Sequence, residues 1–172
     1  MEVIEHEQVL LEKLSNCSRK RYRVVDFCED AAISRRLFYL RYHNMSDMFT
    51  EVLKIQIRRT LRSNSGESIT QMFFRMLEKI KKNKIFYANI RLISKDPRIF
   101  YHNLRKEYAQ AIENYLRPRG AFSVTQVEMV ANGIYAIIDN WVLHECEHPI
   151  VDVFQSIRIL LDDLTRKINR NK

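Results

Sequence analysis

The hydrophobic positions of this chain recur at intervals of three and four residues over most of its length, the pattern of amphipathic α-helices. The register is steadiest after Pro149, where apolar residues continue to Ile168. Earlier segments with helical spacing are residues 5–15, 46–62, 68–82, 85–94, 96–117 and 123–144, with two short helices between residues 23 and 44. The chain is therefore predicted to be all-α, with about nine helices.

Local signals support several of these boundaries. Asp96 followed by Pro97 is a favourable N-cap and first-turn pair, and Ser123-x-x-Gln126 has the spacing of a capping box. The string SNSGES at residues 63–68 is small, polar and glycine-bearing, as linkers are. We therefore predict an N-terminal head over residues 1–62 and a C-terminal body over residues 63–172.

Composition supports the helical prediction and adds a charge. The 172 residues include three glycines and three prolines, too few for the turns that sheets need. Lys and Arg number 29 against 21 Asp and Glu, a net charge of +8, and the pI is about 9.5. This balance favours a polyanionic partner, nucleic acid before a membrane surface.

Targeting signals are weak in this sequence. The N-terminal string MEVIEHEQ is acidic, and no stretch reaches the ~18 apolar residues of a membrane span. The three cysteines are odd in number and form no C-x-x-C pair. We therefore expect a cytoplasmic protein without a membrane partner.

The string HECEH at residues 144–148 fits H-E-x-x-H, the zinc-protease pattern in which two histidines share one helix face. Pro149 follows directly and starts a new helix, so His148 is predicted to lie in the connection, off the helix of His144. A zinc protease also needs a third ligand nearby. We therefore predict no catalytic residue, no metal site and no cofactor, and a protein that is not an enzyme.

Residues 23–44 have the pattern of a helix-turn-helix. A first short helix would place Phe27 and Cys28 inward, and Ser34 is a natural N-cap for a second helix. That cap places Arg35 and Arg36 in the first turn, where an inserted helix meets base edges and arginine can bind guanine O6 and N7. Arginines on a solvated face are the alternative interpretation.

This segment resembles the DNA-binding head of the tetracycline-repressor (TetR) family of bacterial transcriptional regulators. The family's A-x-[VI]-S-x-x-x-F-Y core matches residues 31–39, and the resemblance extends over about residues 5–62. It implies a homodimer that binds a palindromic double-stranded DNA operator, favours a repressor, and implies that a small-molecule effector modulates DNA affinity. The residues implied in DNA binding are Arg19, Lys20, Arg21, Arg23, Ser34, Arg35, Arg36, Leu37, Tyr39, Arg41 and Asn44.

Two departures from the family pattern keep a second hypothesis open. Ala32 replaces the usual turn glycine and is predicted to hold a left-handed conformation at a cost of ~1 kcal/mol. Met45 replaces the lysine that often contacts phosphate. The alternative is a TetR-like dimer that acts mainly as a protein-interaction module or coactivator, with weakened DNA binding.

The resemblance also implies an effector pocket and a dimer seam in the body. Aromatic and apolar side chains that would line the pocket, or else fill the core, are Phe73, Phe74, Phe86, Tyr87, Phe100, Tyr101, Leu104 and Tyr108. The predicted seam is the apolar stripe of the last two helices, with Gly133, Ile137, Trp141, Phe154, Ile157 and Leu161.

Overall fold

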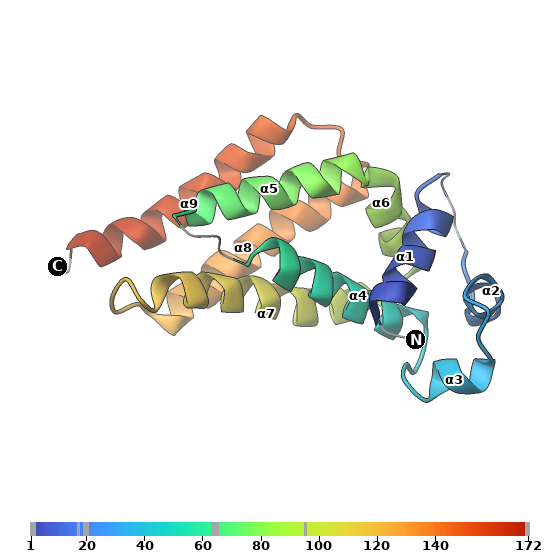
Figure 1. Cartoon of the computed structure of the whole chain (residues 1–172). Coiled ribbons are helices and arrows are strands. Elements are labelled where there is room, and N and C mark those ends of the chain that lie inside the picture. The colour runs from blue at the N-terminus through green and yellow to red at the C-terminus, as the bar shows by residue number, and fades with distance from the viewer. Residues whose placement is uncertain (1–2, 17, 19–20, 63–65, 95, 171–172) are drawn as a thin grey trace.

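The computed structural model describes residues 3–16, 18, 21–62, 66–94 and 96–170. These residues form nine helices and no strand, which confirms the all-α prediction (Figure 1). The helices are α1 (Val3–Leu14), α2 (Val24–Asp30), α3 (Arg35–Tyr39), α4 (Met45–Thr60), α5 (Ile69–Lys82), α6 (Lys84–Ile93), α7 (Pro97–Leu116), α8 (Val124–Leu143) and α9 (Ile150–Arg170). Within the described part of the chain, no helix is long and apolar enough to cross a bilayer.

Side-chain caps set several of the helix starts. Ser34, Ser68 and Ser123 each accept a hydrogen bond from the backbone N–H three residues later, as N-caps do. Asp96 caps α7 with Pro97 in its first turn, as its sequence signal predicted. The predicted helix ends agree with the observed ones to within about two residues, the usual uncertainty of a helix boundary.

The small helices α1, α2 and α3 lie at one end of an elongated molecule, with the C-terminus at the other end (Figure 1). Their shared core is aromatic: the Phe27 ring packs edge-on against Phe38 and against His6 of α1. His6 Nδ1 and the buried Tyr42 hydroxyl are hydrogen-bonded at 2.8 Å, and burial lowers the pKa of His6. The neutral imidazole therefore belongs to this core.

The core of the head continues into the body without a break. One cluster of buried side chains runs from Leu10 of α1 to Leu164 of α9. Between them, α1 is tied to α6 by a buried hydrogen bond of 2.7 Å from Asn89 Nδ2 to the Leu14 carbonyl. The helix α4 runs out of the head and lies along α7, where Arg58 and Glu107 form a bidentate ion pair. The head is therefore packed directly on α6 and α7 of the body.

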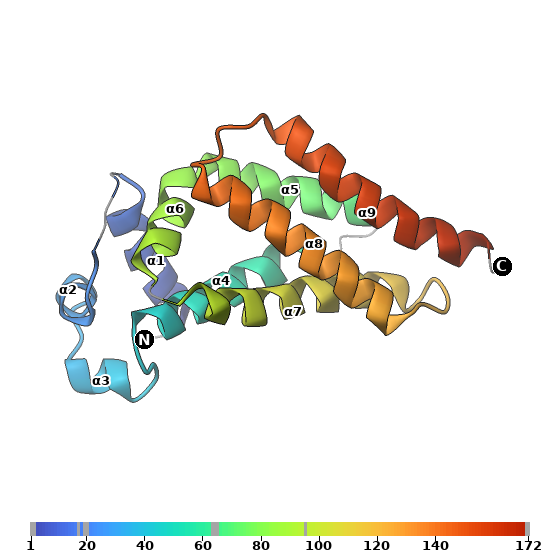
Figure 2. The ribbon, with the colours of Figure 1, turned by 180° about the vertical axis from the view of Figure 1, so that it is seen from behind.

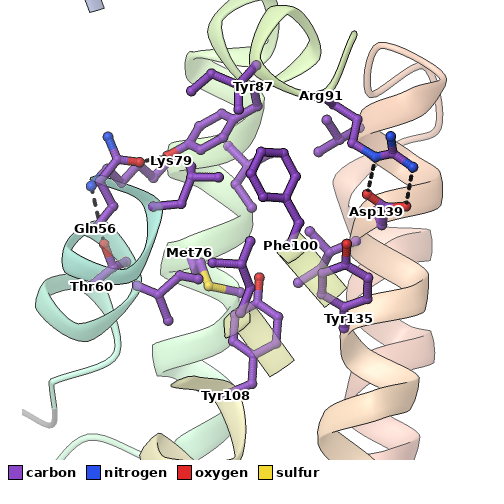
Figure 3. A pocket seen from close by; sticks show the side chains of 17 residues that line it. Gln56, Thr60, Met76, Lys79, Tyr87, Arg91, Phe100, Tyr108, Tyr135 and Asp139 are labelled. Carbon is purple, nitrogen blue, oxygen red and sulfur yellow. Dashed lines mark hydrogen bonds and ion pairs between the residues drawn. The ribbon is translucent and has the colours of Figure 1, made fainter. Parts of the chain in front are cut away.

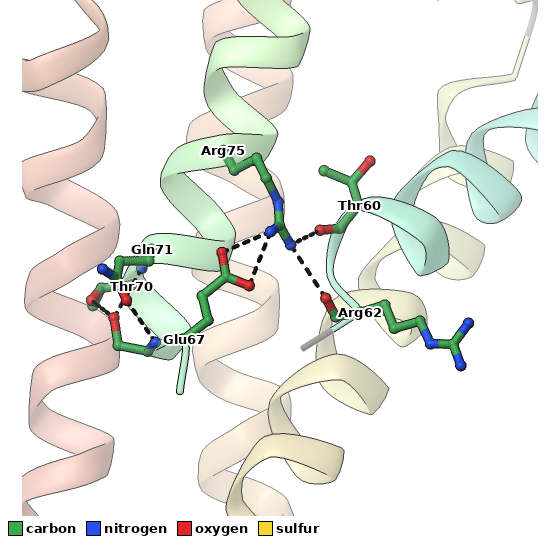
Figure 4. A network of polar contacts seen from close by, with 7 residues as sticks. Thr60, Arg62, Glu67, Thr70, Gln71 and Arg75 are labelled. Atoms are coloured by element: carbon green, nitrogen blue, oxygen red, sulfur yellow. Dashed lines mark hydrogen bonds and ion pairs between the residues drawn. The ribbon is translucent and has the colours of Figure 1, made fainter. Parts of the chain in front are cut away.

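The C-terminal end of α4 is clamped to α5 by one arginine (Figure 4). Arg75 Nη2 donates to the carbonyls of Thr60 at 2.6 Å and Arg62 at 3.2 Å, and Nη1 donates to the Glu67 carboxylate. A cation at a helix C-terminus binds carbonyls that have no partner within the helix. This contact fixes the end of α4 that is farther from the head.

The connection between α8 and α9 contains the H-E-x-x-H pattern and shows where its two histidines lie. The helix α8 ends at Leu143, and Glu145 and Cys146 turn the chain with positive φ angles of 50° and 55°. Trp141 Nε1 donates to the His148 carbonyl at 3.0 Å, which holds the turn in place. His144 and His148 therefore share no helix face, as predicted. Among the described residues, no group of potential ligands is placed to hold a metal ion.

Candidate nucleic-acid interface and effector pocket

The helix α3 protrudes at the end of the molecule, away from the body helices (Figure 1). Ser34 Oγ caps it by accepting from the Leu37 N–H at 3.2 Å, and Phe38 anchors it with 1% of its surface exposed. The same cap sets Arg35 and Arg36 in the first turn, and both side chains are exposed. The predicted first-turn position of the two arginines is therefore confirmed.

The arginines of α3 differ from those of the body in their partners. In the body, Arg58 pairs with Glu107, and Arg91 pairs with Asp139 at 2.7 Å. Among the residues that the structure describes, no carboxylate lies within ion-pair distance of Arg35 or of Arg36. The positive charge of α3 is thus available to an external anion.

Three other residues implied in DNA binding line a groove, and two of them also have partners within the chain. Arg21 is exposed and lines a groove between head and body together with Arg23 and Asn44. The Arg23 guanidinium is bound to Asp26 at 2.9 and 3.1 Å, and this hydrogen bonding lowers the pKa of Asp26. Asn44 accepts from the Asp47 N–H as the N-cap of α4. Arg23 and Asn44 therefore hold helix starts as well as facing the groove.

The remaining predicted positions have simple placements. Arg41 is exposed, with its guanidinium carbon 5.8 Å from the Tyr42 ring centroid. Arg19 and Lys20 lie outside the described residues. Met45, where the TetR pattern often has a lysine, is buried in the first turn of α4, so its side chain presents nothing to an anion.

The sequence interpretation missed one exposed side chain of this surface. Leu40 is 75% exposed at the end of α3, next to Leu37 at 57% and Tyr39 at 51%. Apolar side chains of this kind can contact thymine methyl groups in the major groove. The available signal was that Leu40 falls between Tyr39 and Arg41, on the face away from the anchor Phe38.

Ala32 holds the turn between α2 and α3 in the left-handed region, with φ of 51°, as predicted. The Ile33 N–H donates to the Cys28 carbonyl at 3.0 Å, which closes the end of α2. This conformation costs a residue with a side chain about 1–2 kcal/mol.

The mutation Ala32→Gly is expected to raise the free energy of unfolding by about 0.5–1 kcal/mol, because relief of the strain exceeds the entropy that glycine loses on folding. Urea denaturation followed by circular dichroism measures it. Ala31→Gly is the matched control: Ala31 is right-handed and buried, so the same change there should destabilise the chain. Equal effects at the two positions would contradict this assignment.

A mainly apolar cavity of about 70 Å³ lies among α4, α5, α6, α7 and α8 (Figure 3). Four of the residues predicted to line a pocket do so: Tyr87, Phe100, Leu104 and Tyr108. The other four do not line this cavity. Phe73 and Phe86 are fully buried in the core, Phe74 packs on Phe154, and Tyr101 lies on the surface against Tyr135.

A chain of polar contacts leads from this cavity to the head. Tyr87 hydroxyl donates to Gln56 Oε1 at 2.7 Å, and Gln56 Nε2 donates to Glu7 Oε1 of α1 at 2.8 Å. Arg59 pairs with the same Glu7 carboxylate. The sequence carried a signal for this chain: Gln56 is a polar residue on the buried face of α4, where an apolar one would be expected.

The opposite wall of the cavity carries a second polar group. Arg91 Nε and Nη2 donate to the two carboxylate oxygens of Asp139 at 2.7 and 3.2 Å. Burial, with Asp139 nearby, raises the pKa of Tyr135 beyond its usual range, so this phenol stays protonated. Figure 3 shows these groups facing the wall of Gln56 and Lys79 across Phe100.

Three of the six positions predicted for the dimer seam need correction. Trp141, Ile157 and Leu161 have at most 1% of their surface exposed within a single chain, so they have no surface left for a partner. Phe154 packs against Phe74 of α5, with ring centroids 4.9 Å apart. Gly133 faces α9, since a Cβ built there would lie 2.9 Å from Leu160 Cδ1. Ile137 also packs on the core, and Gly133, Ile137 and Phe154 each keep part of their surface exposed.

Other apolar side chains of α8 and α9 are exposed, on two helices that pack against each other and lie together in front in Figure 2. We call this surface the outer α8–α9 face. Its exposed apolar members are Met129 at 68%, Leu143 at 44%, Val151 at 54% and Ile159 at 69%. Exposed apolar side chains on two neighbouring helices make this face a candidate for association.

Two solved structures share the whole arrangement at low sequence identity. The chain is similar to DhaS, a dihydroxyacetone kinase operon activator, with a TM-score of 0.65 and 16% identity over 95% of this chain and 96% of that one. It is also similar to a Rhodococcus sp. protein described as a TetR-family transcriptional regulator, with a TM-score of 0.53 and 16% identity over 94% and 97%. No protein-family model and no curated protein sequence matches the chain. The fold is that of TetR-family regulators, and both structural neighbours are described as regulators of transcription, not as enzymes.

Proposed function

We propose that this protein is a sequence-specific DNA-binding transcriptional regulator of the cytoplasm, acting as a repressor. In this proposal residues 1–62 form the DNA-binding head, and residues 63–172 bind an effector and dimerise. The observation that carries it is the exposed first turn of α3, where Arg35 and Arg36 have no described ion-pair partner. Arginines at such positions can bind guanine edges in the major groove.

Effector control is supported by the polar chain from the cavity to the head. Because Gln56 bonds both Tyr87 in the cavity wall and Glu7 in α1, a ligand that displaces Gln56 also changes a contact of the head. A ligand shifts the DNA-binding equilibrium only by as much as it prefers one of the two arrangements.

The proposal requires a homodimer, because two heads must reach successive major grooves about 34 Å apart on a palindrome. We place the seam on the outer α8–α9 face, in place of the stripe predicted from sequence. The burial of Ile157 and Leu161 inside the chain removes them from this role.

The test is a selection of bound genomic fragments followed by fluorescence anisotropy at several salt concentrations. A selected fragment should bind at least about a thousandfold more tightly than random DNA, and the affinity for both should fall steeply with salt as counterions are released. Equal affinity for selected and random DNA would contradict sequence-specific binding.

A second function, a protein-interaction module or coactivator with weakened DNA binding, is favoured by two observations. Met45 is buried where a phosphate contact is expected, and the Arg23 guanidinium is held by Asp26. The structural neighbour DhaS is described as an operon activator. Absence of salt-dependent DNA binding in the same anisotropy experiment would support this alternative.

A further inference from the structure

The cavity walls carry an uneven distribution of charge. On one wall Arg91 and Asp139 neutralise each other through two hydrogen bonds. On the facing wall Lys79 has no counterpart: among the described residues no carboxylate lies within ion-pair distance of its Nζ. Lys79 Nζ donates a 3.3 Å hydrogen bond to the Thr60 hydroxyl, a neutral acceptor. The lining therefore holds one positive charge that nothing in the lining balances.

Glu7, the carboxylate whose charge acts on Lys79, is already bound by other residues. Both oxygens of Glu7 accept hydrogen bonds, Oε1 from Gln56 and Oε2 from Arg59. An ammonium group offers three donors, and Thr60 accounts for one of them. Burial lowers the pKa of Lys79, while the nearby charges of Glu7 and Arg59 act on it in opposite directions.

The space beside Lys79 is apolar. Phe100, Ile138 and Leu104 line the cavity and are each less than 10% exposed. Figure 3 shows Lys79, Gln56 and Thr60 on one side and the ring of Phe100 between them and the opposite wall. A bound molecule would therefore need a polar end near Lys79 and an apolar body next to Phe100.

We infer that the effector of this pocket is a small amphipathic carboxylate, whose carboxylate accepts hydrogen bonds from Lys79 and Thr60 and whose apolar body packs beside Phe100. This inference names the effector class within the function proposed above. A single uncompensated positive charge matches a monoanionic carboxylate better than a dianionic phosphate monoester. The carboxylate would also lie next to Gln56, the residue through which the cavity contacts α1.

The experiment measures binding of straight-chain carboxylates from butanoate to octanoate, and of benzoate, to the full chain by calorimetry and thermal shift. The primary amides of the same acids are matched neutral probes, and phenyl phosphate is the dianionic probe. At least one carboxylate should bind about ten- to hundredfold more tightly than its amide, the range of a charge-assisted hydrogen bond. Failure of the whole panel, amides as tight as the acids, or tighter binding of phenyl phosphate would each overturn the inference.

Two variants locate the site. Lys79→Met should lower carboxylate affinity about tenfold or more while leaving the affinity of the amides unchanged. Lys82→Met removes an exposed lysine of the same helix and should change neither. Carboxylate binding that survives in Lys79→Met would overturn the assignment, and thermal melting of each variant checks that the chain is folded.

The same samples separate this inference from the proposed function. Anisotropy with a selected DNA fragment, with and without the carboxylate, reports whether the ligand changes DNA affinity. Carboxylate binding without an effect on DNA affinity would support the ligand class and contradict effector control. DNA binding by a chain that binds no carboxylate would contradict the ligand class and would still support the proposed DNA-binding function.

Discussion

The substitution Ile157→Glu is expected to destabilise the fold of the single chain and not merely to separate two intact subunits. Ile157 is fully buried in α9, on the side packed against α5 and α8. A carboxylate placed there has no partner, and an unpaired buried charge costs about 3–5 kcal/mol. That is a large part of the ~5–15 kcal/mol that stabilises a typical domain. Urea denaturation followed by circular dichroism should show this loss.

Ile159→Glu is the matched substitution on the same helix. Ile159 is 69% exposed on the outer α8–α9 face, so the free energy of unfolding should change by less than about 0.5 kcal/mol. In a dimer that uses this face, sedimentation velocity at micromolar concentration should show monomers for this variant. An Ile157→Glu chain of normal stability would contradict the intrachain packing of Ile157. An Ile159→Glu chain that stays dimeric would contradict the proposed seam.

Loss of either α3 arginine is expected to have the second largest effect. Arg35→Ala or Arg36→Ala should weaken binding to a selected operator by about 1–3 kcal/mol, or about five- to 150-fold, and relax base preference at one position. Anisotropy with the selected fragment and with single-base variants of it measures both quantities. The fold should be unaffected, because both side chains are exposed.

Arg117→Ala controls for the loss of charge. Arg117 is exposed and caps the C-terminal end of α7. That end of the helix lies far from α3 in Figure 1, so removal of Arg117 should leave operator affinity nearly unchanged. Equal losses on operator and random DNA for the α3 variants would make these arginines phosphate contacts. No loss on either would favour the protein-interaction alternative.

Local signals in the sequence predicted the helices well. The capping residues Ser34, Asp96 and Ser123 start helices where expected, because each satisfies a backbone N–H that has no partner in the first turn. Ala32 has the predicted left-handed φ because the turn into α3 needs that conformation whichever residue occupies it. These features depend on residues close together in the chain, which is why the sequence alone was sufficient.

Features that depend on contacts between distant segments were predicted poorly. The apolar period of α9 correctly indicated a buried stripe, but a period does not say whether its own chain or a second copy covers it. Ile157 and Leu161 face α8 and α5 of the same chain, so the seam prediction was wrong for them. The polar wall of the cavity joins Gln56 of α4 to Lys79 of α5 and Tyr87 of α6, and no single helix pattern contains that set.

Because Arg75 holds the C-terminal end of α4, a tilt of this helix would pivot about Thr60. Arg75 holds the carbonyl of Thr60, whereas Met45, at the far end of the helix, adjoins the head. Along the helix axis Gln56 lies about 6 Å from Thr60, and Met45 lies about 22 Å from it. A tilt that displaces Gln56 by a fraction of an ångström would therefore displace the start of α4 about fourfold farther. The cavity is small and lies close to this pivot. A slight movement of its wall would therefore be enough to reposition α3.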